Sequence, residues 1–193
     1  MGLEGNQRND SMKHKFTGKS PRAPSKGAEG VLGKPSLQDY LVIRIDSREQ
    51  TPLSFNEEYV KCGVGTIDCF DYCLEQEGKE GWAIERKSRD DLIQSVALSA
   101  SWKRELAKIA KAQEKLLPII YLCEFAEEDL YTYDYTKFRS GKVSSQFICR
   151  RIGELMFNYN VHVFFAGSRE AASYWICVLL KRRFESLKEA LKI

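Results

Sequence analysis

The tripeptide Glu85-Arg86-Lys87 lies in the segment WAIERKSRDDL, residues 82–92, and places an acid and an amine two positions apart in an apolar run. Side chains alternate along a β-strand, so Glu85 and Lys87 would share one face, about 6.6–7 Å apart, while Arg86 faces the other way. Such a triplet is also common on protein surfaces, and the acids at 90 and 91 equally suit a helix N-terminus. The triplet alone fits both chemistry and a solvated strand end.

Further carboxylates occur where the chain can bring them to the same place. A hairpin can set Asp71 beside Glu85, and a neighbouring strand that ends in IDSRE can add Asp46 or Glu49. Carboxylates held this close repel each other, and a bound divalent cation commonly neutralises this repulsion. Oxygen ligands without nearby histidine favour Mg²⁺ or Mn²⁺ over zinc.

The chemistry that this set of residues permits is phosphodiester hydrolysis. The metal would polarise a phosphoryl oxygen and lower the pKa of a bound water. Lys87 would orient the attacking water or help to deprotonate it, and would offset charge in the transition state.

The elements that must position these residues follow from the apolar spacing. We expect a helix after the triplet, with Ser88 as N-cap, apolar positions through Ile109 and a break near residues 99–101. The other expected elements are strands at 41–46, 62–74, 81–87, 117–125 and 161–167, and helices at 144–159 and 168–193. Such an order predicts an α/β fold, a mixed central sheet flanked by helices.

Composition limits the classes of protein that remain. With 193 residues, 43% of them hydrophobic, we expect one core. Residues 1–36 hold seven Lys and Arg against three Asp and Glu, which predicts a disordered basic arm, with DNA tethering as an open alternative, followed by a single domain at 37–193. The apolar runs are too short to span a bilayer, so we expect no membrane partner. We expect the protein in the cytoplasm, or in the nucleus if the source is eukaryotic. Neither a Walker pattern nor GxGxxG is present, which argues against nucleotide use.

Three linked motifs resemble a known family. The order IDSRE, FDY and ERKSRDD resembles the XPF-type excision-repair nuclease domain, whose pattern joins an Asp-x-Arg-Glu strand end to GDx(n)ERKx3D. The likeness is greatest to the small stand-alone versions of phages and bacteria, and extends over roughly residues 41–185. It implies a restriction-endonuclease-like core of the PD-(D/E)xK type.

The resemblance also implies roles for individual residues. Three carboxylates are implied to approach the metal: Asp46, Asp71 and Glu85. Lys87 is implied to be the catalytic lysine, and Glu49 and Arg86 are implied to belong to the same catalytic set. The supporting residues are Arg48 and Asp91, the latter as a structural acid at the helix start.

Two departures from the family pattern concern the site. Phe70 stands where the family has glycine before the hairpin Asp, and can shift Asp71. The family's Gly-Arg stretch is replaced by SASWKREL, which leaves Lys103 and Arg104 as candidate phosphate contacts. A second candidate set of phosphate contacts, which also reads as a solvated charged loop, is Lys137, Arg139, Lys142 and Arg150.

The main hypothesis is a Mg²⁺-dependent DNA endonuclease that acts on branched, flapped or otherwise structured DNA in repair, recombination or phage DNA processing. One alternative is a non-catalytic DNA-binding subunit that partners an active nuclease, although no predicted acid or lysine has been replaced. Another is a nuclease directed to RNA. The resemblance also implies a homodimer or heterodimer through the nuclease domain, with the last helix as a candidate surface; a helix that packs on the core would show the same pattern.

Overall fold

The computed structural model describes residues 41–190 except 57–59, 79–80, 116 and 139–140. The predicted basic arm at 1–36 therefore lies outside the described residues. In the described part, no helix is long and apolar enough to cross a bilayer.

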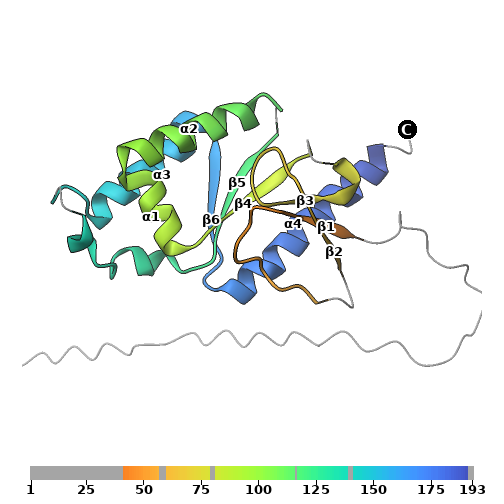
Figure 1. Ribbon diagram of the computed structural model, residues 1–193, viewed down its shortest axis with the longest axis horizontal. Helices are drawn as coiled ribbons and strands as arrows, with labels where there is room; N and C mark the ends of the chain where they lie inside the picture. Colours follow the sequence, from red (N-terminus) through yellow and green to blue (C-terminus); the bar gives the residue numbers. More distant parts are fainter. Residues whose placement is uncertain (1–40, 57–59, 79–80, 116, 139–140, 191–193) are drawn as a thin grey trace, which may run out of the picture. The chain divides into compact units, whose positions relative to one another are not determined.

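Within the described residues, six strands form one mixed sheet in the order β2-β1-β3-β4-β5-β6 (Figure 1). Their bounds are β1 Val42–Asp46, β2 Lys61–Gly65, β3 Tyr72–Leu74, β4 Ala83–Lys87, β5 Ile119–Cys123 and β6 Val161–Phe165. β3 is antiparallel to both β1 and β4, whereas β1 with β2 and β4 with β5 and β6 run parallel. The predicted mixed α/β sheet and the predicted hairpin are confirmed.

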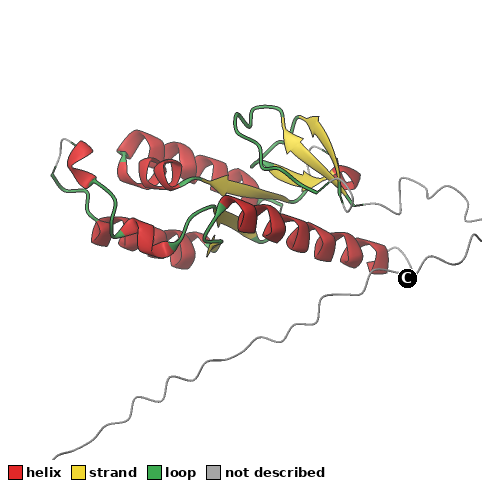
Figure 2. Ribbon diagram, turned by 90° about the horizontal axis from the view of Figure 1, so that it is seen from below, coloured by secondary structure: helices red, strands yellow, loops and turns green. Residues whose placement is uncertain are grey.

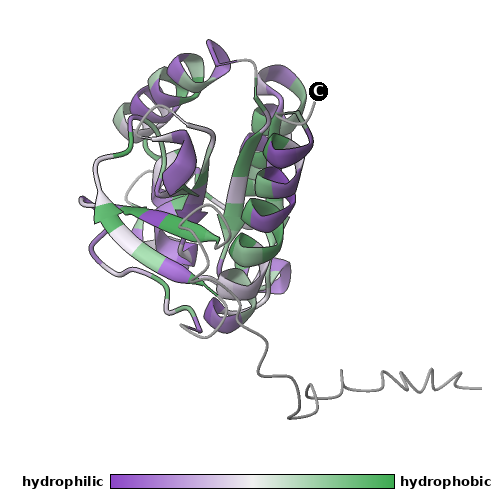
Figure 3. Ribbon diagram, turned by 90° about the vertical axis from the view of Figure 1, so that its right-hand side faces the viewer, coloured by the Kyte–Doolittle hydropathy of each residue, from purple (hydrophilic) through white to green (hydrophobic). Residues whose placement is uncertain are grey.

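In the part of the chain that the structure describes, four α-helices cover the two faces of the sheet (Figures 1 and 2). They are α1 Arg89–Ala97, α2 Ser99–Gln113, α3 Ser145–Tyr159 and α4 Arg169–Ala190. The first three pack into one apolar core, and α4 packs into a second core on the opposite face. In Figure 3 the helices carry both hydrophobic and hydrophilic residues, as expected where one side of each helix packs on a sheet.

The predicted helix start after the triplet is confirmed. The Ser88 hydroxyl accepts a hydrogen bond from Asp91 N at 3.2 Å and donates one to Asp91 Oδ2 at 2.6 Å. The Asp91 N–H, which has no partner within the helix, is thereby satisfied. The predicted break lies at Leu98, whose extended backbone separates α1 from α2.

Two strand predictions differ from the structure. The predicted single strand at 62–74 is two strands, β2 and β3, joined by a loop that carries Ile67 and Asp71. Phe70 has a φ of 70°, in the left-handed region, which interrupts an extended strand. The many β-forming residues of this segment predicted a strand and gave no sign of this turn. The predicted buried strand at 161–167 is the edge strand β6, where His162 and Phe164 are exposed.

Candidate active site

A cleft of about 820 Å³ lies at the ends of β1 and β4, beside α1 and α2. It brings together most of the sequence-predicted site residues. Its charged lining residues are Asp46, Arg48, Glu49, Asp68, Asp71, Glu85, Arg86, Lys87, Asp91, Arg104, Glu105 and Lys108.

Asp71 and Glu85 are neighbours because of the hairpin register. Tyr72 pairs with Ile84, which sets the preceding Asp71 opposite Glu85. Arg86 N donates a hydrogen bond to Asp71 Oδ2 at 2.8 Å. Burial, followed by the charge of Glu85, raises the pKa of Asp71 to about 8. Asp71 therefore favours its protonated form beside the Glu85 carboxylate.

The carboxylate of Glu85 is only half satisfied. Its Oε1 lies 2.6 Å from Lys108 Nζ and 2.9 Å from Lys87 Nζ. Its Oε2 is buried and has no hydrogen-bond partner among the described residues. An unpartnered buried carboxylate oxygen is costly, so this atom marks a position suited to a cation.

Asp71 and Glu85 fit a hard divalent cation. Mg²⁺ is commonly bound through one or two carboxylates, with water and substrate phosphate oxygens in the remaining positions. Within the described ranges, no three His, Cys, Asp or Glu side chains are grouped as ligands of one ion. The fit therefore rests on the pair of acids and not on a three-acid cage.

Lys87 lies between two glutamates. Its Nζ is 2.9 Å from Oε1 of both Glu85 and Glu105, and 5.3 Å from the centre of the Tyr121 ring. Burial by itself would lower the pKa of Lys87, but the two carboxylates raise it well above its usual range. The amine is therefore a cation that can donate hydrogen bonds.

Sequence reasoning missed Glu105 and Lys108, both from α2. Glu105 Oε1 accepts a hydrogen bond from the Tyr121 hydroxyl at 2.6 Å, and Glu105 is 6% exposed. The available signal was a glutamate on the buried stripe of an amphipathic helix, between Trp102 and Ile109. Buried glutamates are rare unless they are paired, so the position of Glu105 on the buried side of the helix indicated that its carboxylate has a partner inside the protein.

Asp46 and Arg48 form a tight pair at the end of β1. The Asp46 carboxylate accepts hydrogen bonds from Arg48 Nε at 2.7 Å, Arg48 Nη2 at 2.9 Å, Arg48 N at 2.8 Å and Ile67 N at 2.7 Å. Burial alone would raise the pKa of Asp46, but these hydrogen bonds together lower it.

Arg86 faces away from Lys87, as the alternation along the strand predicts. Its guanidinium pairs with Glu49 at 3.0 Å and with Glu124 at 2.8 Å. Arg169 joins Glu124 at 2.8 Å. Glu49 is thus engaged with Arg86 and not with Asp71 and Glu85, and sequence reasoning missed Glu124 and Arg169.

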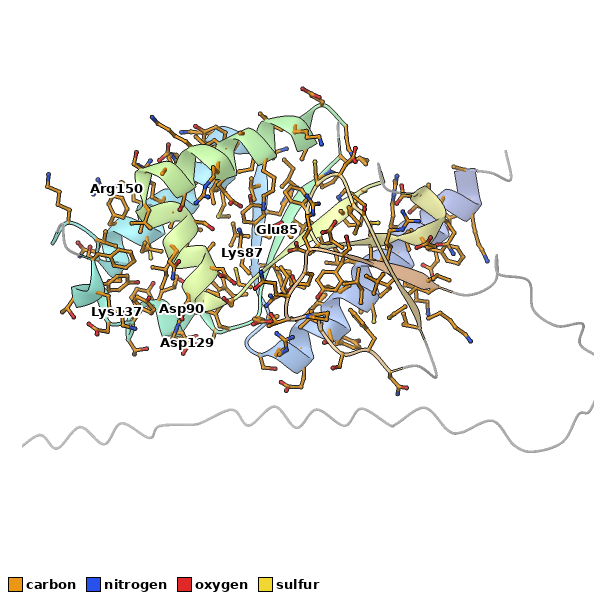
Figure 4. The ribbon with its side chains drawn as sticks, in the orientation of Figure 1. Glu85, Lys87, Asp90, Asp129, Lys137 and Arg150 are labelled. Atoms are coloured by element: carbon orange, nitrogen blue, oxygen red, sulfur yellow. The ribbon has the colours of Figure 1, made fainter. Side chains whose placement is uncertain are left out.

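The predicted phosphate contacts are dispersed. On α2, Arg104 lines the cleft and donates to Ser101 Oγ at 3.1 Å, and Lys103 is exposed. Figure 4 shows Lys137 and Arg150 well away from Glu85 and Lys87.

The other two residues of the second candidate set of phosphate contacts, Arg139 and Lys142, do not strengthen the prediction that this set binds phosphate. Lys142 is exposed, and Arg139 lies outside the described residues. The neighbouring Arg151 stacks on Trp102, 4.7 Å from the ring centre, and pairs with Glu154 at 2.7 Å. Of this set, Lys137 and Arg150 therefore do not lie beside Glu85 and Lys87.

Comparison with known proteins places the chain in a family. A family model described as the ERCC4 domain matches residues 39–179. The match spans most of the sequence, so the chain belongs to the ERCC4 domain family, a family of structure-specific DNA endonucleases whose members generally depend on a divalent metal.

Two solved structures share the fold, both of XPF from Aeropyrum pernix. The complex with DNA has a TM-score of 0.54 at 13% identity and covers 76% of this chain and 66% of that one. The second has a TM-score of 0.53 at 14% identity and covers 77% of this chain and 69% of that one. The chain thus spans about two thirds of their length, and its fold is restriction-endonuclease-like, as predicted. A search of curated proteins found no match.

Proposed function

We propose that this chain is a divalent-metal-dependent endonuclease that hydrolyses phosphodiester bonds in branched, flapped or otherwise structured DNA. The observation that carries the proposal is the meeting of Asp71 and Glu85 beside Lys87, with Glu85 Oε2 buried and unpartnered. Membership of the ERCC4 domain family supports DNA as the substrate, and one similar structure is an XPF complex with DNA.

The acids and the lysine of the site would have different roles in hydrolysis. Asp71 and Glu85 would hold Mg²⁺ or Mn²⁺, which when bound polarises a phosphoryl oxygen and lowers the pKa of a water. Lys87, protonated between Glu85 and Glu105, would donate hydrogen bonds where negative charge develops. Because its amine already holds its proton, Lys87 would orient the attacking water and not deprotonate it.

The test is nicking of a panel of duplex, flap, fork and four-way DNA with Mg²⁺. Lys87→Ala and Asp71→Asn should each lower the rate by on the order of 100-fold or more. Arg182→Ala, an exposed change on α4, is the matched control. Full activity of both site variants, with circular dichroism unchanged, would contradict the assignment.

Calorimetry separates this function from that of a non-catalytic DNA-binding subunit. The wild-type protein should bind Mn²⁺ without DNA, and Asp71→Asn should bind it about tenfold more weakly or worse. DNA binding without any Mn²⁺ binding would favour the scaffold role. Matched RNA flaps in the nicking assay test the choice between DNA and RNA.

We also propose that the chain forms a dimer through β6 and α4. Phe164 on the edge strand and Tyr174 on α4 are 36% and 65% exposed, and both pack against Trp175. Exposed aromatic side chains beside a free strand edge are typical of a protein interface. Sedimentation should show a dimer that Tyr174→Glu weakens; a wild-type monomer at high concentration would refute the homodimer.

A further inference from the structure

We propose that Asp46 is a positioning residue and not a metal ligand, and that it holds Arg48 as a fixed cation that binds a backbone phosphate of the DNA in the cleft. The inference rests on the proposed function. It assigns to the cleft a phosphate site that is separate from the pair of acids Asp71 and Glu85.

The hydrogen bonds of Asp46 leave its carboxylate no free capacity. Oδ1 accepts from Arg48 N and Nε, and Oδ2 accepts from Arg48 Nη2 and Ile67 N, all within 2.9 Å. A carboxylate has about four acceptor positions, and all four are used here. A metal at Asp46 would have to displace charge-assisted hydrogen bonds and leave the buried Ile67 N–H unpaired.

Arg48 is held rigidly yet remains accessible. Its fork is bidentate on Asp46, and Nη2 also donates to the Ile67 carbonyl at 2.5 Å. The side chain of Arg48 is 67% exposed, whereas that of Asp46 is 2% exposed. Nη1 donates no hydrogen bond to any residue that the structure describes. A guanidinium fixed in this way can bind a phosphate with little further loss of side-chain entropy.

The position of Arg48 suits a substrate phosphate. It lines the same cleft as Asp71, Glu85 and Lys87. The acids of this cleft repel a DNA backbone, and Lys87 and Lys108 already face Glu85 and Glu105. Arg48 pairs with Asp46 and not with Glu85 or Glu105, so its Nη1 is available to the strand that enters.

The first test measures DNA binding in EDTA, where no cleavage occurs. The probe is a fluorescein-labelled fork, and its affinity is measured by anisotropy over a range of salt concentrations. Arg48→Ala should reduce the slope of log affinity against log salt by about one, as expected for one lost phosphate contact. Arg48→Lys should restore part of the slope, and the control Arg182→Ala should leave it unchanged.

The double variant tests the link between the two residues. If Asp46 acts through Arg48, Asp46→Asn should weaken binding in the wild-type background and have no further effect in Arg48→Ala. Additive losses, or an unchanged salt slope in Arg48→Ala, would overturn the proposal. A wild-type protein that binds no fork would instead refute the proposed function.

The second test measures Mn²⁺ binding by calorimetry without DNA. Asp46→Asn should keep its affinity to within about threefold, whereas Asp71→Asn should lose about tenfold or more. Equal losses in the two variants would show that Asp46 is a ligand after all. If Asp46→Asn fails to fold, as circular dichroism would reveal, the salt dependence of fork binding by Arg48→Ala still tests whether Arg48 binds a phosphate.

Discussion

Phe70 precedes Asp71 and has a φ of 70°, at the position where the XPF-type pattern has glycine. A side chain in this left-handed region costs about 1–2 kcal/mol. Its ring is buried and packs edge-on against Tyr121, with centroids 6.0 Å apart. The ring's burial offsets the strain, so the turn that presents Asp71 is kept without the glycine.

Paired substitutions at this position separate strain from packing. Both Phe70→Gly and Phe70→Ala lose the ring, at a cost of about 3–5 kcal/mol before the strain is counted. Only glycine relieves the positive φ, so we expect Phe70→Gly to be more stable than Phe70→Ala by about 1 kcal/mol. Urea unfolding of the two variants measures the difference. A more stable Phe70→Ala would show that the residue is not strained.

The raised pKa of Asp71 predicts a pH dependence in the absence of divalent metal. Burial and the charge of Glu85 raise this pKa from 3.8 to about 8. The folded protein therefore holds the proton more tightly than the unfolded chain. The resulting stability is complete below pH 3.8 and is lost as the pH rises through 8. Between pH 5 and 8 we expect a fall on the order of 1–3 kcal/mol.

Urea unfolding in EDTA at pH 5, 6, 7 and 8 measures this fall. Asp71→Asn should flatten the profile, because an amide does not titrate. Asp46 and Glu105 have lowered pKa values, so their contributions change only at more acidic pH. A profile that is equally steep in Asp71→Asn would refute the assignment to Asp71.

At the scale of the elements, the sequence correctly predicted features that depend only on neighbouring residues, such as a helix cap or the alternation of side chains along a strand. The N-cap at Ser88 and the alternation of Glu85, Arg86 and Lys87 both appear in the structure as the sequence indicates. The split of residues 62–74 depends on the backbone turn at Phe70, which no propensity reveals. The engagement of Glu105 with Lys87 depends on how α2 packs over β4 and β5, a tertiary contact that is absent from any local window.

Helix α2 is therefore expected to stabilise the charged form of Lys87. Glu105→Ala removes one of two counterions from the buried Lys87 and leaves the Tyr121 hydroxyl unpaired, at about 3–5 kcal/mol. Glu105→Gln keeps an acceptor for that hydroxyl and should cost less. Denaturant unfolding gives both values, and an equal loss in the two variants would contradict this role of the carboxylate.

For the whole molecule, the two faces of the sheet carry different charge networks. Glu85, Lys87, Glu105 and Lys108 join β4 to α2 on one face. On the other face, Arg86, Glu49, Glu124 and Arg169 join β4 to α4. Arg183 of α4 also pairs with Glu77 in the hairpin at 2.7 Å. The strand that carries the triplet is thus fixed from both sides within the described domain.

This arrangement predicts that residues 37–193 fold without the first 36. The two described cores and the described charge pairs of the cleft are formed by residues within 41–190, so removal of 1–36 should change the unfolding free energy by less than about 0.5 kcal/mol. The segment carries seven Lys and Arg against three Asp and Glu. If it tethers DNA, its removal should weaken fork binding and lower the salt slope. Urea unfolding and anisotropy test the two parts separately, and a truncated chain that does not unfold cooperatively would contradict the domain boundary.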